Sequence, residues 1–136
     1  MELTPGLHGE IEIVVAEADT AHAHGNTGVH VLATPRLVGL LEAAAIRAVA
    51  DHLPTGAGTV GTHLDIRHLA ATPLGMRVTA RATLRQVDGR RLVFDVEARD
   101  EAEPVASGTH ERVQITQARF LERVAAKIAR GGLTPP

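Results

Sequence analysis

One stretch of the sequence would be apolar on nearly every side if it formed a helix. Residues 37–50 carry only two charged side chains, Glu42 and Arg47. The Thr34-Pro35 pair before them is typical of a helix start, because threonine caps free N–H groups and proline fits the first turn. We expect the helix to end near Asp51. A helix this apolar is normally buried on most sides, so the rest of the chain has to cover it.

Most of the remaining chain predicts β-strands with one apolar face. The expected strands are residues 10–16, 59–68, 76–87, 91–99 and 105–116. Asp88-Gly89 predicts a tight hairpin, and the imperfect alternation around Ser107-Gly108 predicts a bulge in the last strand. Residues 17–30 have no clear period and predict a loop or lid, whereas residues 117–129 predict a short amphipathic helix.

A sheet with one apolar face buries an apolar helix most economically by wrapping around it. The order of elements therefore predicts an α+β protein with the hot-dog fold, in which an antiparallel sheet surrounds one long central helix. A single copy would leave apolar helix surface and a sheet edge exposed, so we expect a homodimer. The 136 residues suit one domain, 1–136, with loose ends at residues 1–7 and 131–136.

Composition excludes several classes of function. Only two residues are aromatic, the net charge is −2, and no basic run occurs, so nucleic acid is not an expected partner. The absence of cysteine rules out disulfides, thiolate metal sites and a cysteine nucleophile. The first residues do not form a signal peptide, and no apolar run approaches the ~20 residues that cross a bilayer. We therefore expect a cytoplasmic protein with no membrane partner.

The expected loop contains three histidines, His22, His24 and His30. Histidine is a common metal ligand, but no carboxylate or cysteine completes a recognisable ligand spacing here. We expect no metal, and the segment is better explained as a flexible polar lid.

Glu42 is the first residue that the apolar helix does not explain. An unpaired buried carboxylate is costly unless it is protonated, hydrogen-bonded or faces a wet pocket. It is either a paired structural carboxylate or part of a site. Arg47 is a poor partner within the helix, because five residues correspond to a rotation of about 140°.

His68 lies at the end of the expected strand 59–68. One face of this strand is formed by Val60, Thr62, Leu64, Ile66 and His68. The other face is formed by Thr59, Gly61, His63, Asp65 and Arg67. His68 therefore points inward with the apolar residues. It is either a satisfied core histidine or a general base beside a carboxylate.

Thr34 has a structural role as a helix cap, and capping alone would account for it. It also lies eight residues before Glu42, which places the two about 80° apart around the helix and two turns apart along it. They therefore share a side of the helix. The free N–H groups and positive dipole of a helix N-terminus also suit a developing oxyanion.

Five short motifs occur in the order and at the spacing seen in one known family. They are Ala33-Thr34, residues 38–42, residues 67–75, residues 88–92 and residues 107–112. Between residues 31 and 116 the chain resembles the fluoroacetyl-CoA thioesterase family of hot-dog proteins. Each motif is weak alone, but the set is specific.

The resemblance implies a homodimeric thioesterase that hydrolyses a small acyl-CoA. Thr34, Glu42 and His68 fall on the family's catalytic threonine, glutamate and histidine. Gly61 matches a glycine whose backbone lies close to the thioester carbonyl, and Arg112 matches an arginine near the pocket, so both are expected to bind substrate. No cofactor is implied beyond the CoA of the substrate.

Residues 25–31 lack the phenylalanines of the fluoroacetyl-specific member, so general hydrolysis of small acyl-CoAs is the expectation. Two other classes stay open, an acyl-thioester hydratase or dehydratase and a non-catalytic acyl-CoA-binding protein. The expected outward face of the sheet carries Arg77, Arg81, Arg85, Arg90 and Arg91. These arginines are either a solvated surface or include one or two contacts to the phosphates of CoA.

Overall fold

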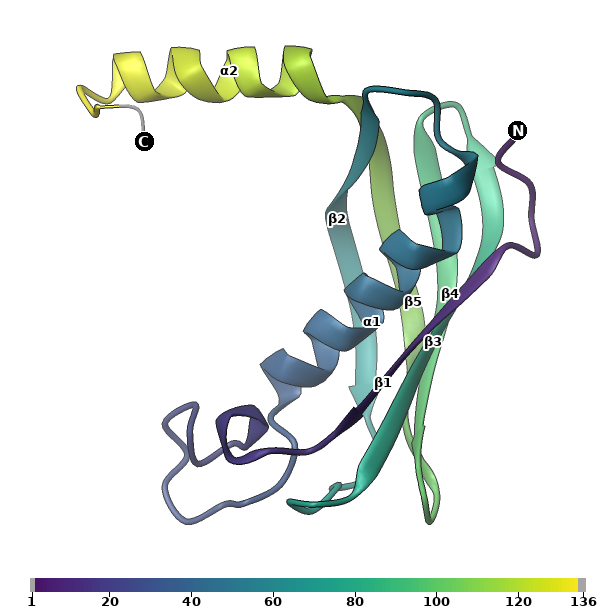
Figure 1. Cartoon of the computed structure of the whole chain (residues 1–136), viewed down its shortest axis with the longest axis vertical. Coiled ribbons are helices and arrows are strands. Elements are labelled where there is room, and N and C mark those ends of the chain that lie inside the picture. Colours follow the sequence, from purple (N-terminus) through teal and green to yellow (C-terminus); the bar gives the residue numbers. More distant parts are fainter. Residues whose placement is uncertain (1, 135–136) are drawn as a thin grey trace.

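The computed structural model describes residues 2–134. Met1, Pro135 and Pro136 belong to the ends predicted to be loose and lie outside this range. The elements are β1 (His8–Val14), α1 (Thr34–Val49), β2 (Ala57–His68), β3 (Arg77–Asp88), β4 (Arg91–Asp100), β5 (Pro104–Thr116) and α2 (Gln117–Arg130). The strands form one antiparallel sheet in the order β1-β3-β4-β5-β2, and α1 lies across one face of it (Figure 1). The predicted α+β class with an antiparallel sheet is confirmed.

The helix α1 is held against the sheet by one apolar stripe. Its buried residues recur at helical spacing and are Leu37, Leu40, Leu41, Ala44, Ala45, Ala48 and Val49. The stripe packs mainly on β1 and β3. The opposite side is less covered than the sequence predicts: Val38 and Glu42 are partly exposed and Ile46 is 47% exposed. These three residues, at steps of four, form an open face of α1.

The central strands provide the apolar floor beneath α1. As predicted, alternate residues of β3 and β4 point inward and are buried; they are Val78, Ala80, Ala82, Leu84, Leu92, Phe94, Val96 and Ala98. The predicted hairpin at Asp88-Gly89 is also confirmed, because Asp88 pairs with Arg91 across a two-residue turn. Gly89 has φ of 61°, which glycine adopts at little cost.

The bulge predicted at Ser107-Gly108 is wrong in its position. Ser107 and Gly108 pair in regular register with β4 and β2, whereas the register between β4 and β5 shifts at Val105, between the pairs Ala98–Ala106 and Arg99–Pro104. A glycine is needed at 108 for a different reason, because a Cβ atom there would collide with the backbone of Asp65 and Ile66 on β2. The irregular alternation of the sequence therefore marks a close approach of two strands.

Another bulge lies in β2, where the register shifts between Gly61 and His63. Gly61 pairs with Arg112, whereas Leu64 pairs with His110, so Thr62 is the extra residue. Since paired residues share a face of the sheet, the bulge reverses the alternation along β2. The predicted outward position of Gly61 is therefore wrong, because it faces α1, as does His68 beyond the bulge.

The strand β2 is one edge of the sheet. It is 12 residues long, none of its residues is buried, and Leu64 is 41% exposed. The helix α2 also extends away from the sheet on the β2 side (Figure 1), and none of its residues is buried. A long exposed edge strand invites pairing with another chain.

In residues 2–134 no helix is long and apolar enough to cross a membrane.

A substitution at Gly9 tests how tightly β1 packs beneath α1. A Cβ atom at this position would lie 2.5 Å from the Ala44 carbonyl oxygen and 2.6 Å from the Ala48 nitrogen. Backbone atoms cannot move aside, so we expect Gly9→Ala to lower the free energy of unfolding by about 2 kcal/mol or more. Urea denaturation measures this, with Gly58→Ala as the control, since nothing lies within 4 Å of that position. Equal stability of the two variants would contradict the packing.

Candidate active site

Thr34 and His68 meet where α1 begins and β2 ends. The Thr34 Oγ1 atom lies 2.8 Å from His68 Nδ1, within hydrogen-bonding distance. The prediction that Thr34 caps the helix is wrong: the N-cap is Ala33, which makes no side-chain cap bond, and Thr34 is the first helical residue. The Thr34 hydroxyl is directed toward the histidine instead.

The second nitrogen of His68 is also available. Its Nε2 atom is buried and has no hydrogen-bond partner among the described residues. A buried polar atom without a partner is costly, so such an atom indicates a place where a ligand or water binds. His68 thus has one ring nitrogen positioned by Thr34 and the other ready to exchange a proton.

These two side chains form part of the wall of a cavity of about 420 Å³. The rest of the wall is mainly small and aliphatic, and consists of Ala21, Asn26, Val29, Val31, Leu32, Leu69, Ala70 and Ala71. Much of it comes from the loop that the sequence predicted as a lid. The cavity offers an apolar space beside a hydroxyl and an imidazole.

The histidines of this loop hold the loop together. The rings of His22 and His30 stack with centroids 4.5 Å apart. The Nδ1 atom of His22 accepts a hydrogen bond from the Gly28 amide, and His24 Nδ1 lies 2.9 Å from the Thr20 carbonyl oxygen. Over residues 2–134 no three histidine, aspartate or glutamate side chains are grouped so that they could hold a metal ion.

Glu42 lies at a second cluster, where it faces Arg112 of β5. The Glu42 Oε2 atom is 3.3 Å from Arg112 Nη1, and the arginine is only 4% exposed. Arg112 also donates to Thr59, through Nε to Oγ1 at 2.8 Å and through Nη2 to the carbonyl oxygen at 3.1 Å. Arg47 is not the partner of Glu42, because its Nη1 atom donates to the Glu10 carbonyl.

His110 completes the cluster and was not identified from the sequence. Its side chain is fully buried, and Nδ1 lies 2.8 Å from the His63 carbonyl oxygen. A carbonyl only accepts, so Nδ1 carries the proton and Nε2 accepts from Arg112 Nη1 at 3.1 Å. Burial, together with the positive charge of Arg112, holds the pKa of His110 below its usual value. The signal that could have found it was its place two residues before Arg112, on the same face of the strand.

Gly61 lies directly beneath the Glu42 carboxylate. A Cβ atom at position 61 would be 2.9 Å from Glu42 Oε2 and 3.3 Å from Arg112 Nη1. Glycine therefore lets the carboxylate approach the backbone of β2 at the bulge. Gly61, Glu42 and Arg112 lie together, as the sequence placed all three at the site.

The two clusters are separate within one chain. Thr34 and Glu42 are eight residues apart on α1, which corresponds to about 12 Å along the helix. His68 and Gly61 are seven residues apart on β2, which corresponds to about 20 Å along the strand. Among the described residues, no hydrogen bond joins Glu42 to Thr34 or His68. The predicted catalytic residues therefore form one pair and one separate carboxylate cluster.

Solved structures define the fold as a hot-dog fold. A hot-dog-like protein from Thermanaerovibrio acidaminovorans superposes with a TM-score of 0.84 at 26% identity, over 92% of this chain and 93% of its own. A thioesterase superfamily member from Thermus thermophilus superposes with a TM-score of 0.88 at 27% identity, over 95% and 96% of the two chains. The predicted hot-dog fold is confirmed.

The sequence match identifies the family within this class. The profile of the fluoroacetyl-CoA-specific thioesterases matches residues 15–118. The fluoroacetyl-CoA thioesterase of Streptantibioticus cattleyicolor is 46% identical over 101 residues, which are 74% of this chain and 73% of that protein. A structure of a fluoroacetyl-CoA thioesterase has a TM-score of 0.87 at 36% identity, over 99% and 100% of the chains. The chain belongs to the fluoroacetyl-CoA-specific thioesterase family, which confirms the resemblance and the predicted thioesterase class.

The buried His110 gives a test of the carboxylate cluster through the pH dependence of stability. Its pKa is lower in the folded than in the unfolded state, so below about pH 6.5 the unfolded chain binds a proton that the folded chain does not. Stability therefore falls as the pH drops below 6.5, with a limiting slope for one proton of about 1.4 kcal/mol per pH unit. We expect His110→Asn to reduce this slope between pH 7 and 5.

The readout is the slope of unfolding free energy against pH from urea titrations, since the variant is also expected to be less stable at every pH. His8→Asn is the matched control, because His8 is exposed on β1. An unchanged slope in His110→Asn would show that His110 does not remain neutral in the folded protein.

Proposed function

We propose that the protein hydrolyses a small acyl-CoA to the free acid and CoA, with Thr34, Glu42 and His68 as its catalytic residues. The observation that carries this proposal is the hydrogen-bonded Thr34–His68 pair at the wall of an apolar cavity, in a member of this family. The proposal includes no metal or cofactor, and CoA enters only as part of the substrate. The protein acts as a single cytoplasmic domain, with neither a nucleic acid nor a membrane as partner.

The size and lining of the cavity are consistent with a substrate that has a small acyl group. Its volume of about 420 Å³ is shared between the acyl group and the start of the CoA arm, and its aliphatic wall suits a short chain. A variant of the fluoroacetyl-CoA-specific thioesterase has been solved with fluoroacetate and CoA, and another with acetyl-CoA. In this chain the loop carries Gly25, Gly28 and Val29, which are far smaller than the phenylalanines of the fluoroacetyl-specific member.

The chemistry follows from bringing the groups of the two clusters together at the cavity. Backbone N–H groups in the first turn of α1, with the Gly61 amide, polarise the thioester carbonyl. Glu42 either attacks the carbonyl carbon directly, forming an anhydride that a water molecule then hydrolyses, or takes a proton from an attacking water. The C–S bond breaks as His68, in its protonated form, gives its proton to the leaving CoA thiolate. The proton released by the water then returns to His68, which restores both groups. Thr34 positions His68 and the carbonyl.

A homodimer is part of this proposal because one chain keeps the catalytic groups apart. In this dimer, the β2 strands of two chains pair antiparallel about a two-fold axis that lies midway between Gly61 and His68. This pairing brings His68 of one chain opposite Gly61 of the other. Glu42 lies beside Gly61, so the partner's Glu42 comes to the Thr34–His68 pair. Each site then takes its Thr34 and His68 from one chain and its Glu42, Gly61 and Arg112 from the other.

The surfaces that such a dimer would cover are open in the single chain. They are the β2 edge, the open face of α1 formed by Val38, Glu42 and Ile46, and the apolar side of α2. On α2, Leu121 is 60% exposed and Val124 is 40% exposed. Exposed apolar surface of this extent usually marks an interface.

The direct test measures free thiol released from acetyl-, fluoroacetyl-, propionyl-, phenylacetyl- and medium-chain acyl-CoA. The protein has no cysteine, so it contributes no background thiol. We expect Glu42→Gln and His68→Ala each to lower kcat by about 10²-fold or more, because each removes a group that handles a proton. Matched controls are Glu97→Gln and His8→Ala, which change exposed residues on β4 and β1.

Near-normal turnover in Glu42→Gln or His68→Ala would refute the catalytic assignment. Hydration of an enoyl-CoA without release of thiol would indicate a hydratase instead. Tight acyl-CoA binding without turnover by the folded protein would indicate a non-catalytic binding protein.

Mixing two inactive variants tests the shared site. If Glu42→Gln and His68→Ala chains are unfolded together and refolded, half of the dimers contain one chain of each kind. In a shared site, such a heterodimer has one intact site, so we expect the mixture to regain about a quarter of wild-type activity, as random pairing predicts. Two Glu42→Gln chains refolded together serve as the control. No recovered activity, with heterodimers confirmed by mass, would place all three residues of a site in one chain.

A further inference from the structure

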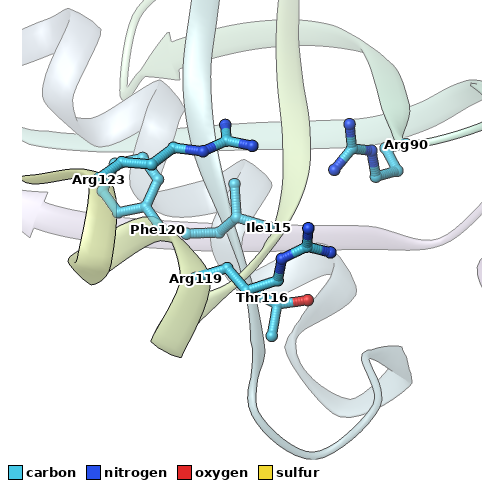
Figure 2. Close-up of a pocket in the computed structure, with 6 residues that line it drawn as sticks. All are labelled: Arg90, Ile115, Thr116, Arg119, Phe120 and Arg123. Carbon is cyan, nitrogen blue, oxygen red and sulfur yellow. The ribbon is translucent and has the colours of Figure 1, made fainter.

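A second cavity, the arginine pocket, lies at the other end of the sheet from His68. Its volume is about 350 Å³, and it is lined by Arg90, Ile115, Thr116, Arg119, Phe120 and Arg123. Ile115 pairs with Gly58 near the start of β2, whereas His68 ends that strand. The pocket therefore lies between the β3–β4 turn, the end of β5 and the first turns of α2 (Figure 2).

The charge of the arginine pocket is not neutralised within the chain. Figure 2 shows the guanidinium groups of Arg119 and Arg123, from α2, and of Arg90, from the turn, directed into a common space. No carboxylate lines the pocket, and in residues 2–134 none forms an ion pair with these three arginines. Like charges brought together repel one another, so this arrangement favours a bound anion.

The other outward arginines behave differently. The sequence grouped Arg90 with four neighbours, and each of those four is paired with a carboxylate; they are Arg77, Arg81, Arg85 and Arg91. Only Arg90 of that group belongs to the arginine pocket. The basic residues of α2 continue the charge from there at steps of four, four and three, as Arg119, Arg123, Lys127 and Arg130.

The chemistry of the lining points to a nucleotide. Guanidinium groups bind phosphate oxygens in a planar, two-point geometry. Phe120 adds a partly exposed ring, on which a planar base can stack, and the only other phenylalanine, Phe94, is fully buried. Phosphate-binding guanidiniums beside one available aromatic face suit an adenine nucleotide better than a simple anion.

We propose that the arginine pocket binds the phosphate and adenine end of CoA. This inference rests on the proposed function, because it supplies the other end of the same substrate. Arg112 contacts Glu42, and Thr116 of the pocket lies four residues further along β5, which corresponds to about 13 Å. An extended pantetheine arm can join a thioester beside Glu42 to phosphates in the pocket. Within a shared site, one chain then supplies Glu42, Gly61 and the arginine pocket.

The test compares substrates with and without the nucleotide. For the Arg119→Ala/Arg123→Ala double variant, we expect KM for acetyl-CoA to rise about 10- to 100-fold, since two charged hydrogen-bond donors are lost. We expect kcat to change less than about twofold and hydrolysis of acetyl-pantetheine, which has no nucleotide, to be unaffected. The matched control is Arg77→Ala/Arg81→Ala, which removes two ion-paired arginines of β3 outside the pocket.

Calorimetry separates this inference from the proposed function. CoA and adenosine 3′,5′-bisphosphate are expected to bind the wild type and to lose at least about tenfold in affinity in the Arg119→Ala/Arg123→Ala variant. Loss of CoA binding in a protein that hydrolyses no thioester would support the pocket and refute the hydrolase. An unchanged KM for acetyl-CoA in an active, folded variant would overturn the pocket and leave the hydrolase intact. Binding of ATP as tight as that of CoA would overturn the assignment to CoA.

Discussion

The buried guanidinium of Arg112 is the constraint on which the site geometry depends. A charge that is only 4% exposed costs several kcal/mol unless it is paired and fully hydrogen-bonded. Arg112 meets this requirement through Thr59, His110 and Glu42. Each of these partners is fixed by its bond to Arg112. Thr59 links the edge strand β2 to β5, His110 stays neutral, and the Glu42 carboxylate is held over Gly61. The Glu42 carboxylate therefore holds its position because it pairs with the buried charge of Arg112.

The bulge in β2 is what allows this cluster and His68 to face the same side. Without the extra residue at Thr62, Gly61 and His68 would lie on opposite faces of the sheet, because they are an odd number of residues apart. With it, Gly61 pairs with Arg112 and His68 pairs with Ala106, both on the face that carries α1. Bulges are frequent next to active sites because they redirect side chains in this way.

Much of this architecture follows from local pattern. The apolar helix, the alternation in β3 and β4 and the turn at Asp88-Gly89 each depend on neighbouring residues, and the structure agrees with them. The errors concern contacts between residues that are far apart in the sequence. The bulge of β5 was placed at Ser107-Gly108 rather than at Val105, and that of β2 was not predicted, because alternation within one strand does not report its partner's register. Likewise, the Glu42–Arg112 pair spans 70 residues, which no local spacing reveals.

The proposed dimer would account for a Glu42 carboxylate that is anomalous in the sequence and still 36% exposed in one chain. A carboxylate on the open face of α1, beside Val38 and Ile46, would be badly placed if that face were buried by the chain's own sheet. In the proposed dimer it would face a second copy and complete a site whose other groups lie beyond its reach within its own chain. The same arrangement would place the arginine pocket on the chain that supplies Glu42. One chain would then hold the nucleotide and the carboxylate, and the other the acyl group and the histidine, so substrate binding itself would favour the assembled dimer.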